Sequence, residues 1–115
     1  MKLIFVDDSD IWRDEATEVA GAQGVSIVTY ALPVEVDASE LESANVVITD
    51  NKFGSAGFLG VDFIRSIRAA GFAGDVVLYT SCPRQGDLRE LTALGGRVVD
   101  KSVFPDALVR SLHAF

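Results

Sequence analysis

Four short apolar runs in this sequence end abruptly in residues that carry an acid, a hydroxyl or an ammonium group. The clearest is residues 44–50, where a run rich in β-branched side chains stops at Asp50. Runs of this length and composition are typical of buried strands. The other three are residues 3–6 before Asp7 and Asp8, residues 76–79 before Thr80, and residues 97–100 before Lys101. If these strands are parallel, their carboxyl ends share one edge of a sheet, and we expect the five polar groups to converge there.

The segments between these runs have the spacing of helices. Apolar residues recur at helical intervals in residues 11–22, in residues 63–70 before Gly71, and in residues 88–94 before two glycines. The pattern also predicts a second strand at 25–30, a short helix at 38–43 and a last helix that begins near Pro105. Strands that alternate with helices in this way predict an α/β fold. We expect a single doubly wound, flavodoxin-like (βα)5 domain over residues 1–115, with a parallel five-stranded sheet in the order 2-1-3-4-5.

Composition narrows the classes of function. A chain of 115 residues with 49% hydrophobic and 23% charged residues is ordinary for one folded domain. The net charge of −7 argues against nucleic acid or an anionic membrane as a partner, since both require a basic face. One cysteine cannot form an internal disulfide, and no apolar segment approaches the roughly 20 residues of a membrane span. A cytoplasmic location is therefore expected.

The acidic residues at the strand ends predict a metal site. Asp7, Asp8 and Asp50 would together form a cage of carboxylate oxygens, which suits Mg²⁺ (or Mn²⁺), an ion that keeps several waters and bridges to phosphate. The alternative interpretation is structural: Asp7 and Asp8 would form a solvated acidic turn that caps the next helix. For Asp50 that alternative is weaker, because an ionised carboxylate at the end of an apolar strand is costly without a cation beside it.

Asp50 also has the chemistry of a nucleophile toward phosphorus. A carboxylate can form an acyl phosphate if positive charge neutralises the incoming phosphoryl oxygens. Thr80 would donate its hydroxyl hydrogen to one phosphoryl oxygen, Lys101 would pair with a second, and Mg²⁺ with a third. The chain would then be a phosphoacceptor with self-catalysed phosphotransfer and dephosphorylation rather than a conventional enzyme.

As a set, these residues resemble the receiver domain of two-component response regulators, the CheY-like family, over essentially the whole chain. The resemblance implies that Asp50 receives its phosphoryl group from a histidine kinase or a histidine phosphotransfer protein and that a downstream protein reads the result. It implies that Asp7, Asp8 and the backbone carbonyl of Lys52 bind Mg²⁺, that Thr80 is the switch hydroxyl, and that Lys101 binds the phosphoryl group.

Three positions depart from the family pattern. Gly54 and Ser102 stand where receivers usually carry proline, and Val98 stands where they usually carry an aromatic residue three positions before the lysine. The connection after Asp50 is also about two residues longer than in the family. Because a branched valine cannot replace a rotating aromatic ring, we expect the phosphorylation signal to leave through residues 51–60, with its two phenylalanines, Phe53 and Phe58.

The predicted function is a stand-alone receiver that is phosphorylated on Asp50 and changes a protein-binding surface. An alternative is a pseudo-receiver, the same fold used as a phosphorylation-independent interaction module. A third is a small phosphohydrolase with a nucleophilic aspartate, which is disfavoured because Lys52, rather than a second acid, follows two residues after Asp50.

Overall fold

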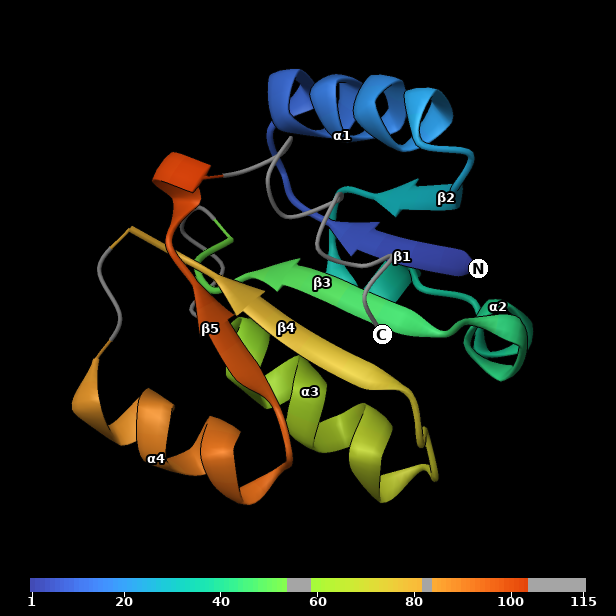
Figure 1. Cartoon of the computed structure of the whole chain (residues 1–115). Coiled ribbons are helices and arrows are strands. Elements are labelled where there is room, and N and C mark those ends of the chain that lie inside the picture. Colours follow the sequence, from blue (N-terminus) through green and yellow to red (C-terminus); the bar gives the residue numbers. More distant parts are fainter. Residues whose placement is uncertain (54–58, 82–83, 104–115) are drawn as a thin grey trace.

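The computed structural model describes residues 1–53, 59–81 and 84–103, and its centre is a five-stranded parallel sheet (Figure 1). The order is β2-β1-β3-β4-β5, so the predicted fold class and strand order are confirmed. The strands are β1 (Lys2–Val6), β2 (Ser26–Tyr30), β3 (Val46–Asp50), β4 (Asp75–Tyr79) and β5 (Arg97–Val99). Every position of β3 is buried, as expected for the central strand of a sheet covered on both faces.

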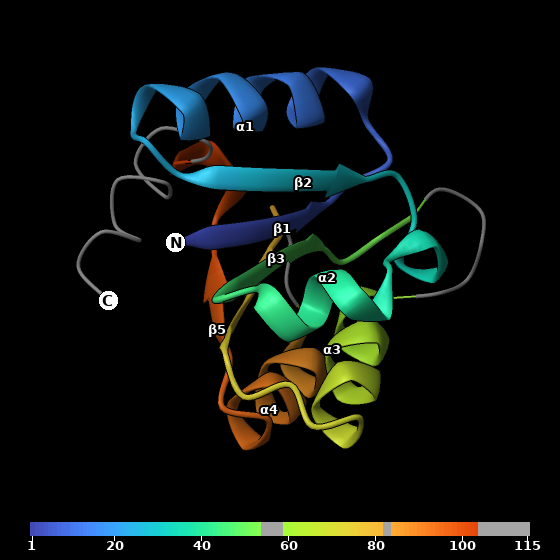
Figure 2. The ribbon, with the colours of Figure 1, turned by 90° about the vertical axis from the view of Figure 1, so that its right-hand side faces the viewer.

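Within the described residues, one helix lies on one face of the sheet and three lie on the other (Figure 2). Helix α1 (Asp10–Ala22) packs on one face, against a core cluster that includes Phe5, Ile48 and Tyr79. On the other face lie α2 (Ala38–Ser43), α3 (Gly60–Ala69) and α4 (Gln85–Ala93), over a second cluster. Short 3₁₀ turns occur at η1 (Pro33–Glu35) and η2 (Lys101–Val103). The predicted helix after Pro105 lies outside the described residues.

The ends of the helices follow local sequence signals. The Ser9 hydroxyl accepts a hydrogen bond from the Trp12 N–H, which makes Ser9 the N-cap of α1. Just beyond α1 and α3, Gly24 and Gly71 have φ angles of 72° and 101°, a backbone region that glycine adopts without steric strain. Helix α1 therefore starts one residue earlier than predicted and ends where predicted.

The core includes one phenylalanine from the connection after β3. Only 3% of the surface of Phe53 is accessible, and the residue belongs to the same core cluster as Phe63 and Ile67 of α3. Burying such a side chain contributes roughly 1.5–3 kcal/mol. Phe58 lies outside the described residues. Ala70, the last residue of the predicted 63–70 pattern, is exposed, because it follows the last residue of α3 and lines the open groove between α2 and α3.

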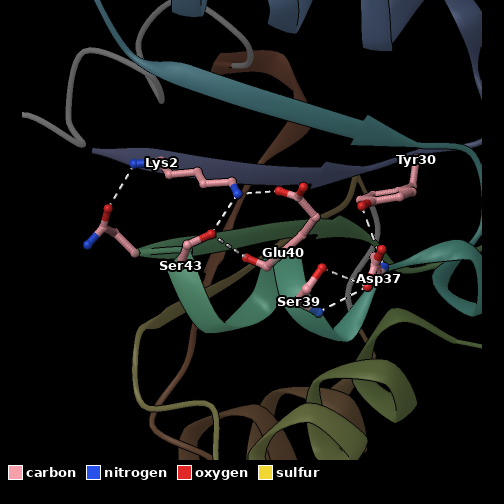
Figure 3. Close-up of polar contacts among 7 residues, drawn as sticks. Lys2, Tyr30, Asp37, Ser39, Glu40 and Ser43 are labelled. Atoms are coloured by element: carbon pink, nitrogen blue, oxygen red, sulfur yellow. Dashed lines mark hydrogen bonds and ion pairs between the residues drawn. The ribbon is translucent and has the colours of Figure 1, made fainter.

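Helix α2 is held on the sheet by polar contacts (Figure 3). The Lys2 ammonium group, on β1, pairs with the Glu40 carboxylate and donates to the Ser43 hydroxyl over 2.6 Å. At the start of α2, Asp37 accepts the N–H of Ser39 over 3.0 Å and thereby caps the helix. This cap helps a segment of only six residues to form the predicted helix at 38–43. Within the described parts of the chain, no helix combines the length and apolarity needed to cross a membrane.

Candidate functional site

The strand register brings the predicted site residues to one edge of the sheet. Asp50 is the last residue of β3 and lies opposite Tyr79, the last residue of β4. Tyr79 lies in turn opposite Val99, the last residue of β5. On the other side, β1 ends at Val6, which pairs with Thr49. The residues that follow these strands therefore meet at the point between β1 and β3 where the strand order reverses, which is where ligands bind in sheets of this class.

Three carboxylates gather at this point. Each of Asp7, Asp8 and Asp50 offers an oxygen, and these oxygens all lie within 4.8 Å of one another. Asp7 and Asp50 are buried, with 1% and 7% of their surface accessible, whereas Asp8 is exposed. Burial raises the pKa of Asp7 to about 6, and the nearby charge of Asp50 acts in the same direction. Negative charges this close together repel one another, and a bound cation would relieve the repulsion.

Among the residues that the structure describes, one oxygen of Asp7 has no hydrogen-bond partner. Asp7 Oδ1 accepts the N–H of Ser9 over 2.8 Å, but Asp7 Oδ2 is buried and accepts no hydrogen bond within the described part of the chain. Such a buried acceptor is costly unless an ion or a water binds it. Together with the hard oxygens of Asp8 and Asp50, it forms a donor set that fits a divalent cation with oxygen coordination.

Lys101 places a positive charge beside Asp50. Its Nζ lies 3.4 Å from Asp50 Oδ2, and 5.1 Å and 5.7 Å from the ring centres of Tyr79 and Trp12. The two rings hold the ammonium group at the site through cation–π attraction. Burial raises the pKa of Asp50, while Lys101 and the N–H groups of Asn51 and Lys52 oppose that rise. The carboxylate of Asp50 thus lies beside one positive charge and is partly shielded from water.

Thr80 and Lys52 complete the set of residues predicted from the sequence. Thr80 follows β4, is 7% exposed, and donates its N–H to the carbonyl of Val99 over 3.1 Å. This bond ties the backbone of Thr80 to β5, one residue beyond Tyr79, the register partner of Asp50. Lys52 is exposed and forms an isolated antiparallel bridge with Leu59. Its backbone N–H points to Asp50, which keeps the Lys52 backbone at the site.

The sequence analysis missed a group of polar side chains next to the site, formed by Asn51, Asp87 and Arg84. The Asn51 side chain is buried and donates from Nδ2 to Asp87 Oδ2 over 3.2 Å, and Asp87 also accepts from Arg84. Asn51 directly follows Asp50, so the alternation of side chains along a strand already placed it on the opposite face. No signal in the sequence pointed to Asp87, because its partner lies 36 residues away.

Comparisons with known proteins identify the fold. No family model matches this sequence, and a search of curated proteins found no match either. Among solved structures, however, 211 chains match, so the result does not depend on a single neighbour. One is the chemotaxis response regulator CheY4 of Vibrio cholerae, with 21% identity and a TM-score of 0.79, covering 98% of this chain and 96% of that one.

Two further neighbours agree. A CheY-like response regulator receiver domain from Methanospirillum hungatei has 16% identity and a TM-score of 0.84, covering 98% of this chain and 90% of that chain. The DrrB receiver domain, in a structure described as BeF3 activated, has 19% identity and a TM-score of 0.79, covering 98% of this chain and 94% of that chain. This chain therefore has the fold of CheY-like response regulator receiver domains, as the resemblance in its sequence implied.

Proposed function

We propose that this chain is a receiver domain spanning residues 1–115, which accepts a phosphoryl group on Asp50 from a phosphohistidine of a partner kinase or phosphotransfer protein. The observation that carries the proposal is the pairing of Lys101 Nζ with Asp50 Oδ2 at 3.4 Å, beside two further carboxylates, on a receiver fold. A downstream protein would read the changed surface. In line with the sequence analysis, we expect the protein to act in the cytoplasm.

The transfer would proceed by direct displacement at phosphorus. A carboxylate oxygen of Asp50 forms a bond to phosphorus while the P–N bond of the phosphohistidine breaks and the imidazole nitrogen leaves with the electron pair. Lys101 neutralises negative charge on the transferred group, and the Thr80 hydroxyl donates to one of its oxygens. Trp12 and Tyr79 keep the ammonium group of Lys101 directed into the site.

Mg²⁺ (or Mn²⁺) fits the remaining donors. Asp7, Asp8 and Asp50 would hold it, with the Lys52 carbonyl as a further ligand implied by the family resemblance. When bound, the cation supplies positive charge to the phosphoryl oxygens and relieves the repulsion among the three carboxylates. The buried Asp7 Oδ2, which lacks a hydrogen-bond donor within the described residues, supports this assignment.

Intact-mass analysis tests the proposal. The protein is incubated with acetyl phosphate and MgCl₂, and we expect the mass of one phosphoryl group to be added and to map to Asp50. Asp50→Asn and chelation of the metal should each abolish the addition. An unchanged mass at high donor concentration, or a phosphate on another residue, would refute phosphorylation of Asp50.

One observation favours the alternative of a phosphorylation-independent interaction module. A groove of about 530 Å³ lies between η1, α2 and α3, and its lining is mostly apolar. At its rim, Val34 is 87% exposed and Leu32 is 37% exposed. A binding groove of this kind does not require a phosphoryl group. If the mass experiment fails while the protein remains folded, the interaction module becomes the preferred function.

A further inference from the structure

Asn51 makes more polar contacts than its place in a connecting segment suggests. The residue is buried, with only 1% of its surface accessible. The amide Nδ2 donates to Asp87 Oδ2 over 3.2 Å, and the amide Oδ1 accepts the N–H of Val61 over 3.3 Å. A buried amide with both ends satisfied is held in one orientation, because any rotation breaks a hydrogen bond that water cannot replace.

The backbone of the same residue contacts the proposed phosphoacceptor. The Asn51 N–H donates to Asp50 Oδ1 over 2.8 Å, and the Asn51 carbonyl accepts the N–H of Gly60 over 2.8 Å. Gly60 is the first residue of α3, and a Cβ atom at this position would lie 2.1 Å from the Asp50 carbonyl oxygen. One residue thus connects the Asp50 carboxylate, the start of α3 and α4.

The two side chains of this dipeptide face opposite sides of the sheet. Val46 and Ile48 pack in the cluster under α1, whereas Val47 packs in the cluster under α3 and α4. Continuing the alternation puts Asp50 on the α1 side, next to Lys101, and Asn51 on the α4 side, where its contact with Asp87 is found. A change at the Asp50 carboxylate therefore reaches the opposite layer through one peptide unit.

The Asp87 side chain is held in place by several hydrogen bonds. It is 7% exposed, lies in the first turn of α4, and accepts hydrogen bonds from Arg84 Nε at 2.9 Å and Arg84 Nη2 at 3.4 Å as well as from Asn51. Burial raises its pKa, but the hydrogen bonds from Arg84 and Asn51 outweigh that effect and hold the pKa below the ordinary value. A carboxylate at this end of a helix is also favoured by the helix dipole.

We propose that Asn51 is a positioning residue that couples the chemical state of Asp50 to the first turn of α4. The inference rests on the proposed function of Asp50. It extends the expectation from the sequence that residues 51–60 carry the signal, because the contacts of Asn51 lead out of that connection and into a helix. The downstream protein already proposed would bind the surface that includes the first turn of α4.

The physical cause of this coupling is a loss of negative charge on the Asp50 oxygen that accepts the Asn51 N–H. As a carboxylate, Asp50 shares its charge between both oxygens, and Oδ1 is a strong acceptor for the Asn51 N–H. As an acyl phosphate, Asp50 has one oxygen bonded to phosphorus and one carbonyl oxygen, and each is a weaker acceptor than the carboxylate. The Asp50–Asn51 peptide is then free to reorient, and the Asn51 amide transmits the change to Asp87.

A matched pair of substitutions at Asp87 tests this coupling. Asp87→Asn keeps an oxygen that accepts from Asn51 Nδ2 but loses the ion pair with Arg84, whereas Asp87→Ala loses both. Backbone amide shifts are recorded for wild type and both variants, with and without Mg²⁺ and beryllofluoride. We expect the activation shifts at residues 85–88 to persist in wild type and Asp87→Asn and to be lost in Asp87→Ala. Equal responses in all three, or loss in both variants, would overturn the role of the Asn51 contact.

Two further measurements separate this inference from its premise. Asn51→Ala should reduce the response at residues 85–88 as Asp87→Ala does, and the double variant should lose no more than either single variant. Because coupling is reciprocal, Asp87→Ala should also shift the amides of residues 50–52 without any phosphoryl mimic, and Asp87→Asn should shift them less. A wild type that binds no beryllofluoride refutes the proposed function, whereas unshifted amides at 50–52 refute the connection itself.

Discussion

The ammonium nitrogen of Lys101 lies 5.7 Å from the centre of the indole ring of Trp12. The same nitrogen lies 3.4 Å from Asp50 Oδ2, so one cation contacts both the proposed phosphoacceptor and the only tryptophan of the chain. The indole ring therefore adjoins the cation that is proposed to contact the phosphoryl group on Asp50.

Tryptophan emission should consequently report on the site. Addition of Mg²⁺ and beryllofluoride should change the fluorescence intensity of Trp12, because Lys101 turns toward the phosphoryl mimic and its distance from the indole changes. Steady-state fluorescence titration measures this, with Asp50→Asn as the control that shows no beryllofluoride response. A wild type that is phosphorylated by mass yet silent in fluorescence would show that Lys101 keeps its position.

Lys101 should also contribute to the rate of phosphorylation. Lys101→Ala removes the positive charge that faces Asp50, and we expect the initial rate with acetyl phosphate to fall by about 100-fold, the order of magnitude for loss of one preorganised electrostatic contact. The rate is followed by intact mass over time. Arg97→Ala, which changes an exposed cation on β5, serves as the control. Equal rates for Lys101→Ala and wild type would remove Lys101 from the reaction.

The metal-free protein should lose stability as the pH rises through about 6. Burial raises the pKa of Asp7 to about 6 from its ordinary value of 3.8, so the folded state holds the proton more tightly than the unfolded chain does. The stabilisation of the folded state by protonated Asp7 is fully present below about pH 4. It is lost as Asp7 ionises, which lowers the free energy of unfolding by about 3 kcal/mol.

Urea denaturation of wild type and Asp7→Asn in EDTA measures this effect. The free energy of unfolding of wild type, relative to the variant, should fall between pH 4 and pH 7, because the amide does not ionise. The comparison cancels the pH dependence of stability that comes from carboxylates with lowered pKa values, such as Asp37 and Asp87. A difference that stays constant over this range would mean that Asp7 ionises in the folded state at its ordinary pKa.

Divalent cations should stabilise the folded protein. Mg²⁺ that binds only the folded state raises the melting temperature by mass action, and the increase should be larger above pH 6, where Asp7 is ionised. Asp8→Ala should remove most of the increase, because Asp8 is one of three carboxylates within 4.8 Å. Differential scanning fluorimetry with and without MgCl₂ measures both effects. An Asp8→Ala variant that responds as fully as wild type would make Asp8 a residue of the turn alone.

Gly60 should not tolerate a side chain. A Cβ atom there would lie 2.1 Å from the Asp50 carbonyl oxygen and 3.0 Å from Leu78 Cδ1, so Gly60→Ala forces the start of α3 away from the site. We expect a loss of about 3 kcal/mol in the free energy of unfolding, measured by urea denaturation. Gly21→Ala, in α1 with nothing within 4 Å of the added atom, should gain up to about 1 kcal/mol. Equal stability of the two variants would contradict the close approach of α3 to Asp50.

The sequence by itself determined the elements, their order and the edge at which the polar residues meet. Apolar runs such as residues 44–50 are strands because their β-branched side chains must be buried on both faces, and the right-handed connection between parallel strands leaves few topologies. That constraint brings Asp7, Asp50, Thr80 and Lys101 to one edge without knowledge of any side-chain contact. Helix ends at Gly24 and Gly71 followed from local backbone preference in the same way.

Only the tertiary structure decided which polar groups are buried together. The contact of Asn51 with Asp87 joins residues 36 positions apart, and the position of Lys101 over Trp12 joins residues from opposite ends of the chain. Neither is encoded in a local pattern, because a hydrogen bond or a cation–π contact depends on distances set by the packing of whole helices on the sheet. The raised pKa of Asp7 and the burial of Phe53 have the same origin, since burial is a property of the assembled layers.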